Sequence, residues 1–110
     1  MLFCITANYT PQALEAMGKN PNTNRREAVE KLVTAAGGKL VAMYGIISEG
    51  PGAMVIFEAD PAAAPAIAAV AAASGGVTNV RVQRLLSGDE VRAARQKRVE
   101  LQKSYRAPGQ

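Results

Sequence analysis

The stretch Lys39–Asp60, KLVAMYGIISEGPGAMVIFEAD, decides the fold of this chain. It predicts two β-strands joined by a turn at Ser48–Gly52, because glycine and proline between apolar runs favour a turn. Side chains alternate between the two faces of a strand. Strict alternation gives these opposing sets: Leu40, Ala42, Tyr44 and Ile46 against Val41, Met43 and Ile47, and Ala53, Val55 and Phe57 against Met54, Ile56 and Glu58.

All of these sets are largely apolar, whereas a sheet with one face in water alternates apolar and polar residues. We therefore expect both faces of the sheet to be covered. The chain has 110 residues, and its helices suffice for one face. The other face is expected to meet a second subunit, in a homo-oligomer that is a dimer or larger. The alternative is that the C-terminal helix folds back over this face within one chain.

The rest of the chain supplies the partners of this hairpin. The predicted elements are a strand at Leu2–Tyr9, a helix at Gln12–Lys19, a helix from about Asn24 to Gly37, a helix at Ala62–Ala73 and a strand at Val77–Leu86. Thr10-Pro11 and Asp60-Pro61 are typical of helix starts, since a polar cap precedes proline in the first turn. The order β-α-β-β-α-β predicts a ferredoxin-like α+β domain with a four-stranded antiparallel sheet.

An extra helix is predicted after this unit. Acidic residues at its start and basic residues at its end suit the helix dipole. We divide the chain into a domain at 1–88, a basic C-terminal helix at 89–106 and a flexible tail at 107–110. Residues 1–88 hold 7 basic and 6 acidic side chains, whereas residues 89–110 hold 6 basic and 3 acidic ones. The net charge of +4 therefore belongs mainly to the C-terminal segment.

Composition narrows the possible chemistry. The chain has no histidine, which excludes His-based triads, His metal sites and His pH switches. Cys4 is the single cysteine, so no disulfide forms within the chain, and a reducing cytoplasm is the expected location. Nothing at the N-terminus resembles a signal peptide, and no apolar run approaches the ~20 residues of a membrane span. We expect no metal, no cofactor and no membrane association.

Several stretches resemble the GYD-domain family of small bacterial proteins over roughly residues 1–90. They are Tyr9-Thr10-Pro11, Arg25-Arg26-Glu27-Ala28, Gly37-Gly38-Lys39-Leu40-Val41, Tyr44, Phe57-Glu58-Ala59-Asp60 and Asn79-Val80-Arg81. The Gly-x-Tyr-Asp motif that names the family is expected near Ser48–Pro51, where this chain has Ser-Glu-Gly-Pro. The resemblance implies a ferredoxin-like unit that pairs through its sheet into a dimeric α/β-barrel type of oligomer. It implies no site at the turn.

Two tyrosines and an arginine are candidate ligand-binding residues. Tyr9 and Tyr44 end or cross strands and could line a pocket, although core aromatics with a hydrogen-bonded hydroxyl need no ligand. Arg81 and Arg84 are predicted on opposite faces of the last strand. Arg81 is a candidate for holding an anion through two hydrogen bonds. The alternative is a solvated edge strand.

Glu58 is the remaining candidate for ligand binding. Together with Asp60 it could form a carboxylate pair for acid–base chemistry. The simpler interpretation is that Asp60 caps a helix and Glu58 faces solvent or pairs with Arg81 or Arg84. Cys4 on a strand is interpreted as a small buried hydrophobe. We assign no catalytic residue.

Three functions remain open. We favour a non-enzymatic oligomeric module that binds a small molecule or a protein through its sheet–helix cleft or its C-terminal helix. The alternative is a cofactor-independent dimeric α/β-barrel enzyme for a small apolar substrate, with Tyr9, Tyr44 and Glu58 around one cavity. A weaker interpretation is nucleic-acid binding by the basic C-terminal helix, which would fall steeply with salt and disappear on truncation after Leu86. We do not expect a nucleic-acid partner, because this helix carries no base-reading motif.

Overall fold

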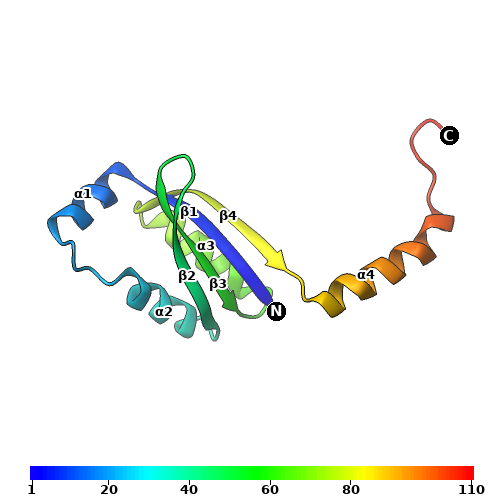
Figure 1. Cartoon of the computed structure of the whole chain (residues 1–110), viewed down its shortest axis with the longest axis horizontal. Coiled ribbons are helices and arrows are strands. Elements are labelled where there is room, and N and C mark those ends of the chain that lie inside the picture. The colour runs from blue at the N-terminus through cyan, green and yellow to red at the C-terminus, as the bar shows by residue number, and fades with distance from the viewer.

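The computed structural model describes all 110 residues, and its sheet and helices are arranged as Figure 1 shows. The elements are β1 (Leu2–Tyr9), α1 (Pro11–Lys19), α2 (Arg25–Ala35), β2 (Lys39–Ile47), β3 (Pro51–Glu58), α3 (Ala63–Ala73), β4 (Val77–Leu85), α4 (Gly88–Leu101) and a 3₁₀ turn at Gln102–Ser104. The strands form one antiparallel sheet in the order β2-β3-β1-β4. The expected ferredoxin-like α+β fold with an extra C-terminal helix is confirmed.

Three of the four helices begin at a side-chain cap, provided by Thr10, Asn24 and Ser87, whereas α3 does not. Thr10 Oγ1 accepts a hydrogen bond from the Ala13 N–H at 3.2 Å, with Pro11 in the first turn of α1. The expected cap of α3 by Asp60 is wrong. The helix begins at Ala63 with no side-chain cap, and only the backbone oxygen of Asp60 accepts a bond, from the Ala63 N–H. The turn at Pro61 therefore separates Asp60 from the helix that it was expected to cap.

The core lies between the sheet and the helices α2 and α3. Phe57 of β3 and Val33 of α2 are fully buried, and the ring of Phe57 stacks on Phe3 with 5.9 Å between centroids. On α3 the buried residues are Ala64, Ile67 and Ala68. Alanine side chains allow the helix to lie close against the strands. Residues Phe3, Val55 and Phe57 therefore define the helix-covered face of the sheet.

A bulge in β2 changes the predicted alternation. The register shifts between Leu40, which pairs with Phe57, and Ala42, which pairs with Ile56. Leu40 is therefore on the helix-covered face and buried, while Ala42 and Tyr44 are on the opposite face. The expectation that Leu40 shares a face with Ala42 and Tyr44 is wrong, because Val41 is an extra residue at the bulge. The predicted faces of β3 are confirmed.

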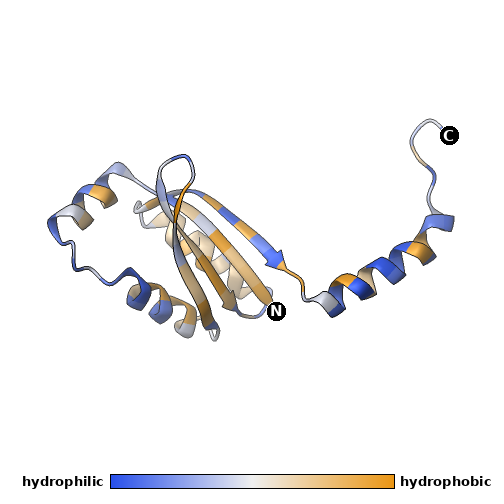
Figure 2. Cartoon of the chain, in the orientation of Figure 1, coloured by the Kyte–Doolittle hydropathy of each residue, from blue (hydrophilic) through white to orange (hydrophobic).

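No helix of the chain covers the opposite face of the sheet. The helix α4 extends away from the strands (Figure 1), and none of its residues is buried. Its surface is mainly hydrophilic, in contrast to the strands (Figure 2). The radius of gyration is 17.9 Å, whereas about 13 Å is expected for a compact chain of this length. The interpretation that the C-terminal helix folds back over the sheet is therefore wrong.

Candidate functional site

The uncovered face is the surface formed by the strand side chains that point away from α2 and α3. The register aligns these residues in cross-strand rows from β2 to β4: Lys39, Glu58, Leu2 and Leu85; Ala42, Ile56, Cys4 and Gln83; Tyr44, Met54, Thr6 and Arg81; Ile46, Gly52, Asn8 and Thr78. Apolar residues occupy most of β2 and β3 in this surface. Polar residues occupy the β4 edge and the end beside the β2–β3 turn.

The apolar part of this face lacks a partner within the chain. Tyr44 is 61% exposed, and Met54 and Ile56 are half-buried. Cys4 is only 4% exposed because its neighbours on adjacent strands enclose its small side chain. Burial raises the pKa of the Cys4 thiol, so the group is protonated at neutral pH. Contiguous exposed apolar surface is a common feature of protein interaction sites.

A polar recess lies at one end of the uncovered face. It is a cavity of about 70 Å³ with only two hydrophobic residues in its lining: Thr6, Ala7, Asn8, Ile46, Ser48, Glu49, Asn79 and Arg81. Asn8 is buried at its base and donates from Nδ2 to the backbone oxygens of Ser48 at 2.7 Å and Gly50 at 3.1 Å. This side chain therefore fixes the β2–β3 turn against β1.

Two residues of the recess have left-handed backbone. Glu49 has a φ of 59° in the turn, and Asn79 has a φ of 55° at the bulge in β4. Asn79 Nδ2 donates to Asn8 Oδ1 at 3.0 Å and lies 3.5 Å from Glu49 Oε2. Left-handed backbone at non-glycine residues costs energy and gathers at functional sites. These hydrogen bonds hold Glu49 and Asn79 beside the recess.

The sequence-predicted residues are divided between the faces. Tyr44, Glu58 and Arg81 lie on the uncovered face, and Arg81 borders the recess. Tyr9 lies on the helix-covered face, where it lines an apolar cavity. Tyr9 therefore does not share a cavity with Tyr44 and Glu58 in this chain. Asn8, Glu49 and Asn79 were missed, although Asn8 is a buried amide in a mostly apolar strand, and its polar side chain there was an available signal.

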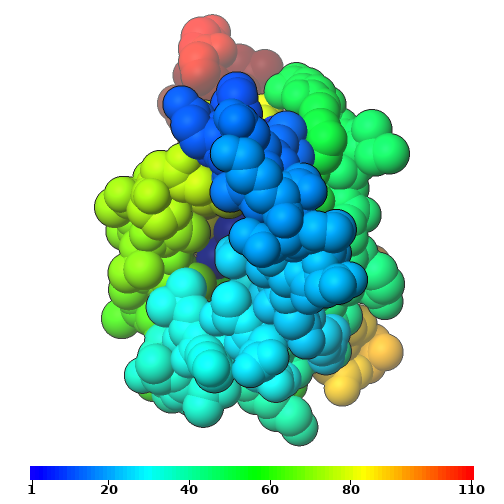
Figure 3. Space-filling view, turned by 90° about the vertical axis from the view of Figure 1, so that its left-hand side faces the viewer, coloured from blue at the N-terminus to red at the C-terminus, as the bar shows by residue number.

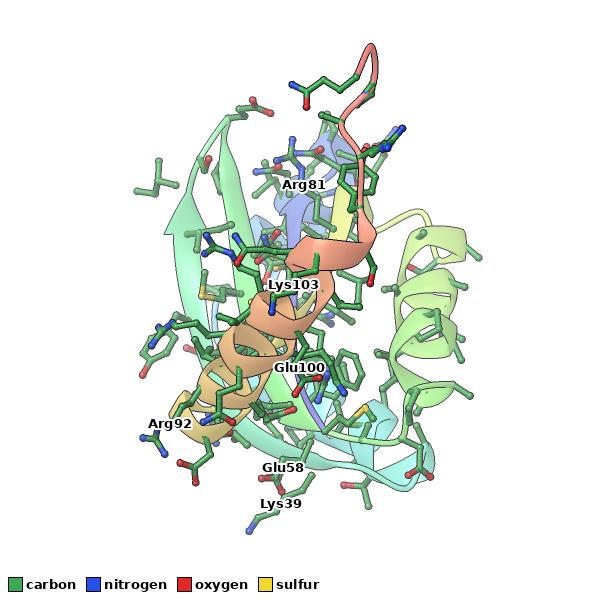
Figure 4. The ribbon with its side chains drawn as sticks, turned by 90° about the vertical axis from the view of Figure 1, so that its right-hand side faces the viewer. Lys39, Glu58, Arg81, Arg92, Glu100 and Lys103 are labelled. Carbon is green, nitrogen blue, oxygen red and sulfur yellow. The ribbon has the colours of Figure 1, made fainter.

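Glu58 is remote from the recess. It aligns with Leu2 of β1, whereas Arg81 aligns with Thr6, which is four residues further along the strand or about 13 Å away. Figure 4 shows Arg81 and Glu58 toward opposite ends of the sheet, with Glu58 beside Lys39. The suggested pairing of Glu58 with Arg84 is wrong, because Arg84 forms an ion pair with Glu90.

The C-terminal helix carries its positive charge on several sides. Successive helix residues are separated by about 100°, so Arg92, Arg95 and Arg98 lie within about 120° of one another and Lys97 projects to the opposite side. Arg92 pairs with Asp89 at 3.1 Å, and Lys97 pairs with Glu100 at 3.4 Å (Figure 4 labels Arg92 and Glu100).

Two further features are absent from the structure. No three or more Cys, Asp or Glu side chains come together in a way that could hold a metal ion. None of the helices combines the length and apolar character that crossing a bilayer requires.

The fold and its uncovered face define a ferredoxin-like α+β domain with the recess at the hairpin end of the sheet. The chain belongs to the GYD-domain family, whose model matches residues 3–94. This match includes all four strands, except the first residue of β1, and the first half of α4. No curated protein shows significant sequence similarity to the chain. The recess includes Ser48 and Glu49 of the turn where the family motif is expected.

Proposed function

We propose that this GYD-family chain is a homo-oligomeric binding module, in which two copies pack through their uncovered faces and hold a small polar ligand at the recess. The observation that supports the oligomer is the apolar surface around Tyr44, Met54 and Ile56, which no element of the chain covers. Removing such surface from water is favourable. A twofold axis would place the same patch of each copy against the other.

The ligand site of this proposal is the recess. Its volume of about 70 Å³ is too small for a large molecule. It presents the carboxylate of Glu49, the guanidinium of Arg81 and the side chain of Asn79. Such a set suits a small molecule that carries both donors and acceptors. A second copy on the same face would close the open side of this cavity.

Binding is a better proposal than catalysis for this arrangement. The candidate acid–base group Glu58 lies about 13 Å along the sheet from Arg81. Glu49 is held by Asn79 in a turn that Asn8 fixes, which suits recognition of a ligand. We place the module in the cytoplasm, since the free thiol of Cys4 is compatible with a reducing compartment.

The test compares two substitutions that place a carboxylate on an apolar surface. Ile56→Glu puts the charge at the centre of the uncovered face, and Val70→Glu puts it on the exposed side of α3, where Val70 is 55% exposed. Light scattering at micromolar concentration should give an oligomer for the unmodified chain and for Val70→Glu, and a monomer for Ile56→Glu. Circular dichroism would verify that each variant is folded. An oligomer that survives Ile56→Glu would contradict the proposed interface.

A further inference from the structure

A second cavity lies on the other side of the sheet, under the helices. The helix α2 packs over β2 and α3 packs over β4, so the helices leave the middle strands partly open between them. Figure 3 shows a hollow between α3 on one side and α1 and α2 on the other, with β1 at its base. Tyr9 lies in this region and has no part in the interface proposed above.

The inner part of the hollow is completely apolar. It is a cavity of about 80 Å³ whose eleven lining residues are all hydrophobic, including Ile5, Tyr9, Leu32, Val55 and Ala71. An apolar cavity without an occupant destabilises a fold, because its walls lose contacts on one side. An apolar group that enters this cavity would restore those contacts.

The outer part of the hollow is wider and carries a charge. It is a cavity of about 270 Å³ that shares Tyr9 and Val77 with the inner one and is bordered by Met17, Asn20 and Arg25. Arg25 takes part in none of the five ion pairs of the chain. Cavities of about 270 and about 80 Å³ that adjoin reach the lower end of the range for small-molecule sites, about 300–1,000 Å³.

The helix α2 contributes residues to both cavities, with Arg25 at the outer one and Leu32 at the inner one. Arg25, Val29 and Leu32 are spaced by four and three residues, so they lie on one side of the helix. Arg25 and Leu32 are separated by about 10 Å along the helix axis. Arg25 is also the first residue of α2, where the helix dipole favours an anion. A ligand with an anionic end and an apolar chain matches this arrangement.

We propose that the hollow binds a small amphipathic carboxylate, with its alkyl or aryl part in the inner cavity and its carboxylate at Arg25. Tyr9 lines both cavities and can therefore contact both parts of such a ligand. Met17 at the outer wall can adapt to ligands of different shape, because its side chain is flexible. The inference does not rest on the oligomer, since the hollow and the uncovered face are on opposite sides of the sheet.

The experiment uses octanoate as the probe and calorimetric titration of the full chain as the measurement. Arg25→Gln should weaken octanoate binding at least tenfold, and Arg26→Gln is the matched control because Arg26 does not border the cavity. Ala71→Leu should fill the inner cavity and abolish binding, and Ala72→Leu on the exposed side of α3 should leave it unchanged. At ten times its dissociation constant, octanoate should raise Tm by about 5–10 °C.

Circular dichroism and Tm of each variant in the absence of octanoate separate lost binding from lost folding. Octylammonium, which has a similar chain and the opposite charge, should bind more weakly than octanoate. The proposal is overturned if folded chain takes up no octanoate at millimolar concentration. It is equally overturned if a folded Ala71→Leu variant binds as the unmodified chain does, or if octylammonium binds as tightly as octanoate.

Discussion

The Nδ2 group of Asn79 donates a hydrogen bond to Oδ1 of Asn8 across 3.0 Å, and so connects the bulge of β4 to the central strand β1. The Nδ2 group of Asn8 in turn donates to two backbone oxygens of the β2–β3 turn. The buried side chain of Asn8 therefore positions both the β2–β3 turn, which contains Glu49, and the bulge of β4, which contains Asn79. The shape of the recess depends on this pair.

Asn8→Ala should destabilise the chain by about 1–3 kcal/mol, because the partners of a buried side chain lose their hydrogen bonds. Urea unfolding provides the free energy, and hydrogen exchange should increase at the Ser48 N–H, which donates to the Gly50 oxygen within the turn. Asn22→Ala is the control. Asn22 is exposed in the α1–α2 loop, and its replacement should change the free energy by less than about 0.5 kcal/mol. Equal effects of the two substitutions would show that Asn8 does not anchor the turn.

Gly52→Ala should destabilise the chain by about 3 kcal/mol or more, as expected for severe overpacking. A Cβ atom at Gly52 would overlap the backbone oxygen of Ala7 on the neighbouring strand. Gly45→Ala in β2 is the matched control, because its Cβ would meet only the Gly52 oxygen, at 3.9 Å. Thermal unfolding should therefore separate the two variants clearly. A Gly52→Ala chain as stable as the Gly45→Ala chain would refute the close approach of β3 to β1.

The start of α4 should depend on pH through Glu90. The backbone hydrogen bond from Ser87 and the charge of Arg84 lower the pKa of Glu90 below its ordinary value of 4.5. Because the folded-state pKa is the lower one, this stabilisation is complete above the unfolded-state pKa and is lost as pH falls through the folded-state pKa. Carbon NMR of the Glu90 carboxyl group should record a titration midpoint below 4.5.

Glu90→Gln should reduce the acid-dependent loss of helix content that circular dichroism records for the whole chain. Glu100→Gln is the control, because Glu100 is in the last turn of the same helix and outside the capping box. A Glu90 midpoint at or above 4.5 would show that the capping box does not form in solution.

Local sequence patterns predicted the elements but not how their faces combine. Turn residues and helix caps such as Thr10 act over a few positions, so they can be recognised in the sequence. The bulge at Val41 shifts the alternation of β2, and no local signal distinguished Val41 from its neighbours. Whether Tyr9 shares a face with Tyr44 depends on the register between strands, which tertiary packing sets.

The recess was harder to predict for the same reason. Asn8, Glu49 and Asn79 belong to three separate segments that the sheet brings together. Arg81 was predicted because it is an arginine on a strand, but its neighbours could be identified only from the structure. The resemblance to the GYD-domain family implied the fold. The family match confirms the resemblance over residues 3–94. Because the turn lacks the motif that names the family, the resemblance predicted no site residues there.

Sedimentation equilibrium of the 110-residue chain at micromolar concentration tests the central claim most directly, since its result does not depend on molecular shape. The uncovered face predicts a particle of at least twice the 11.5 kDa mass of one chain. A single well-folded species of 11.5 kDa across the whole concentration range would contradict it.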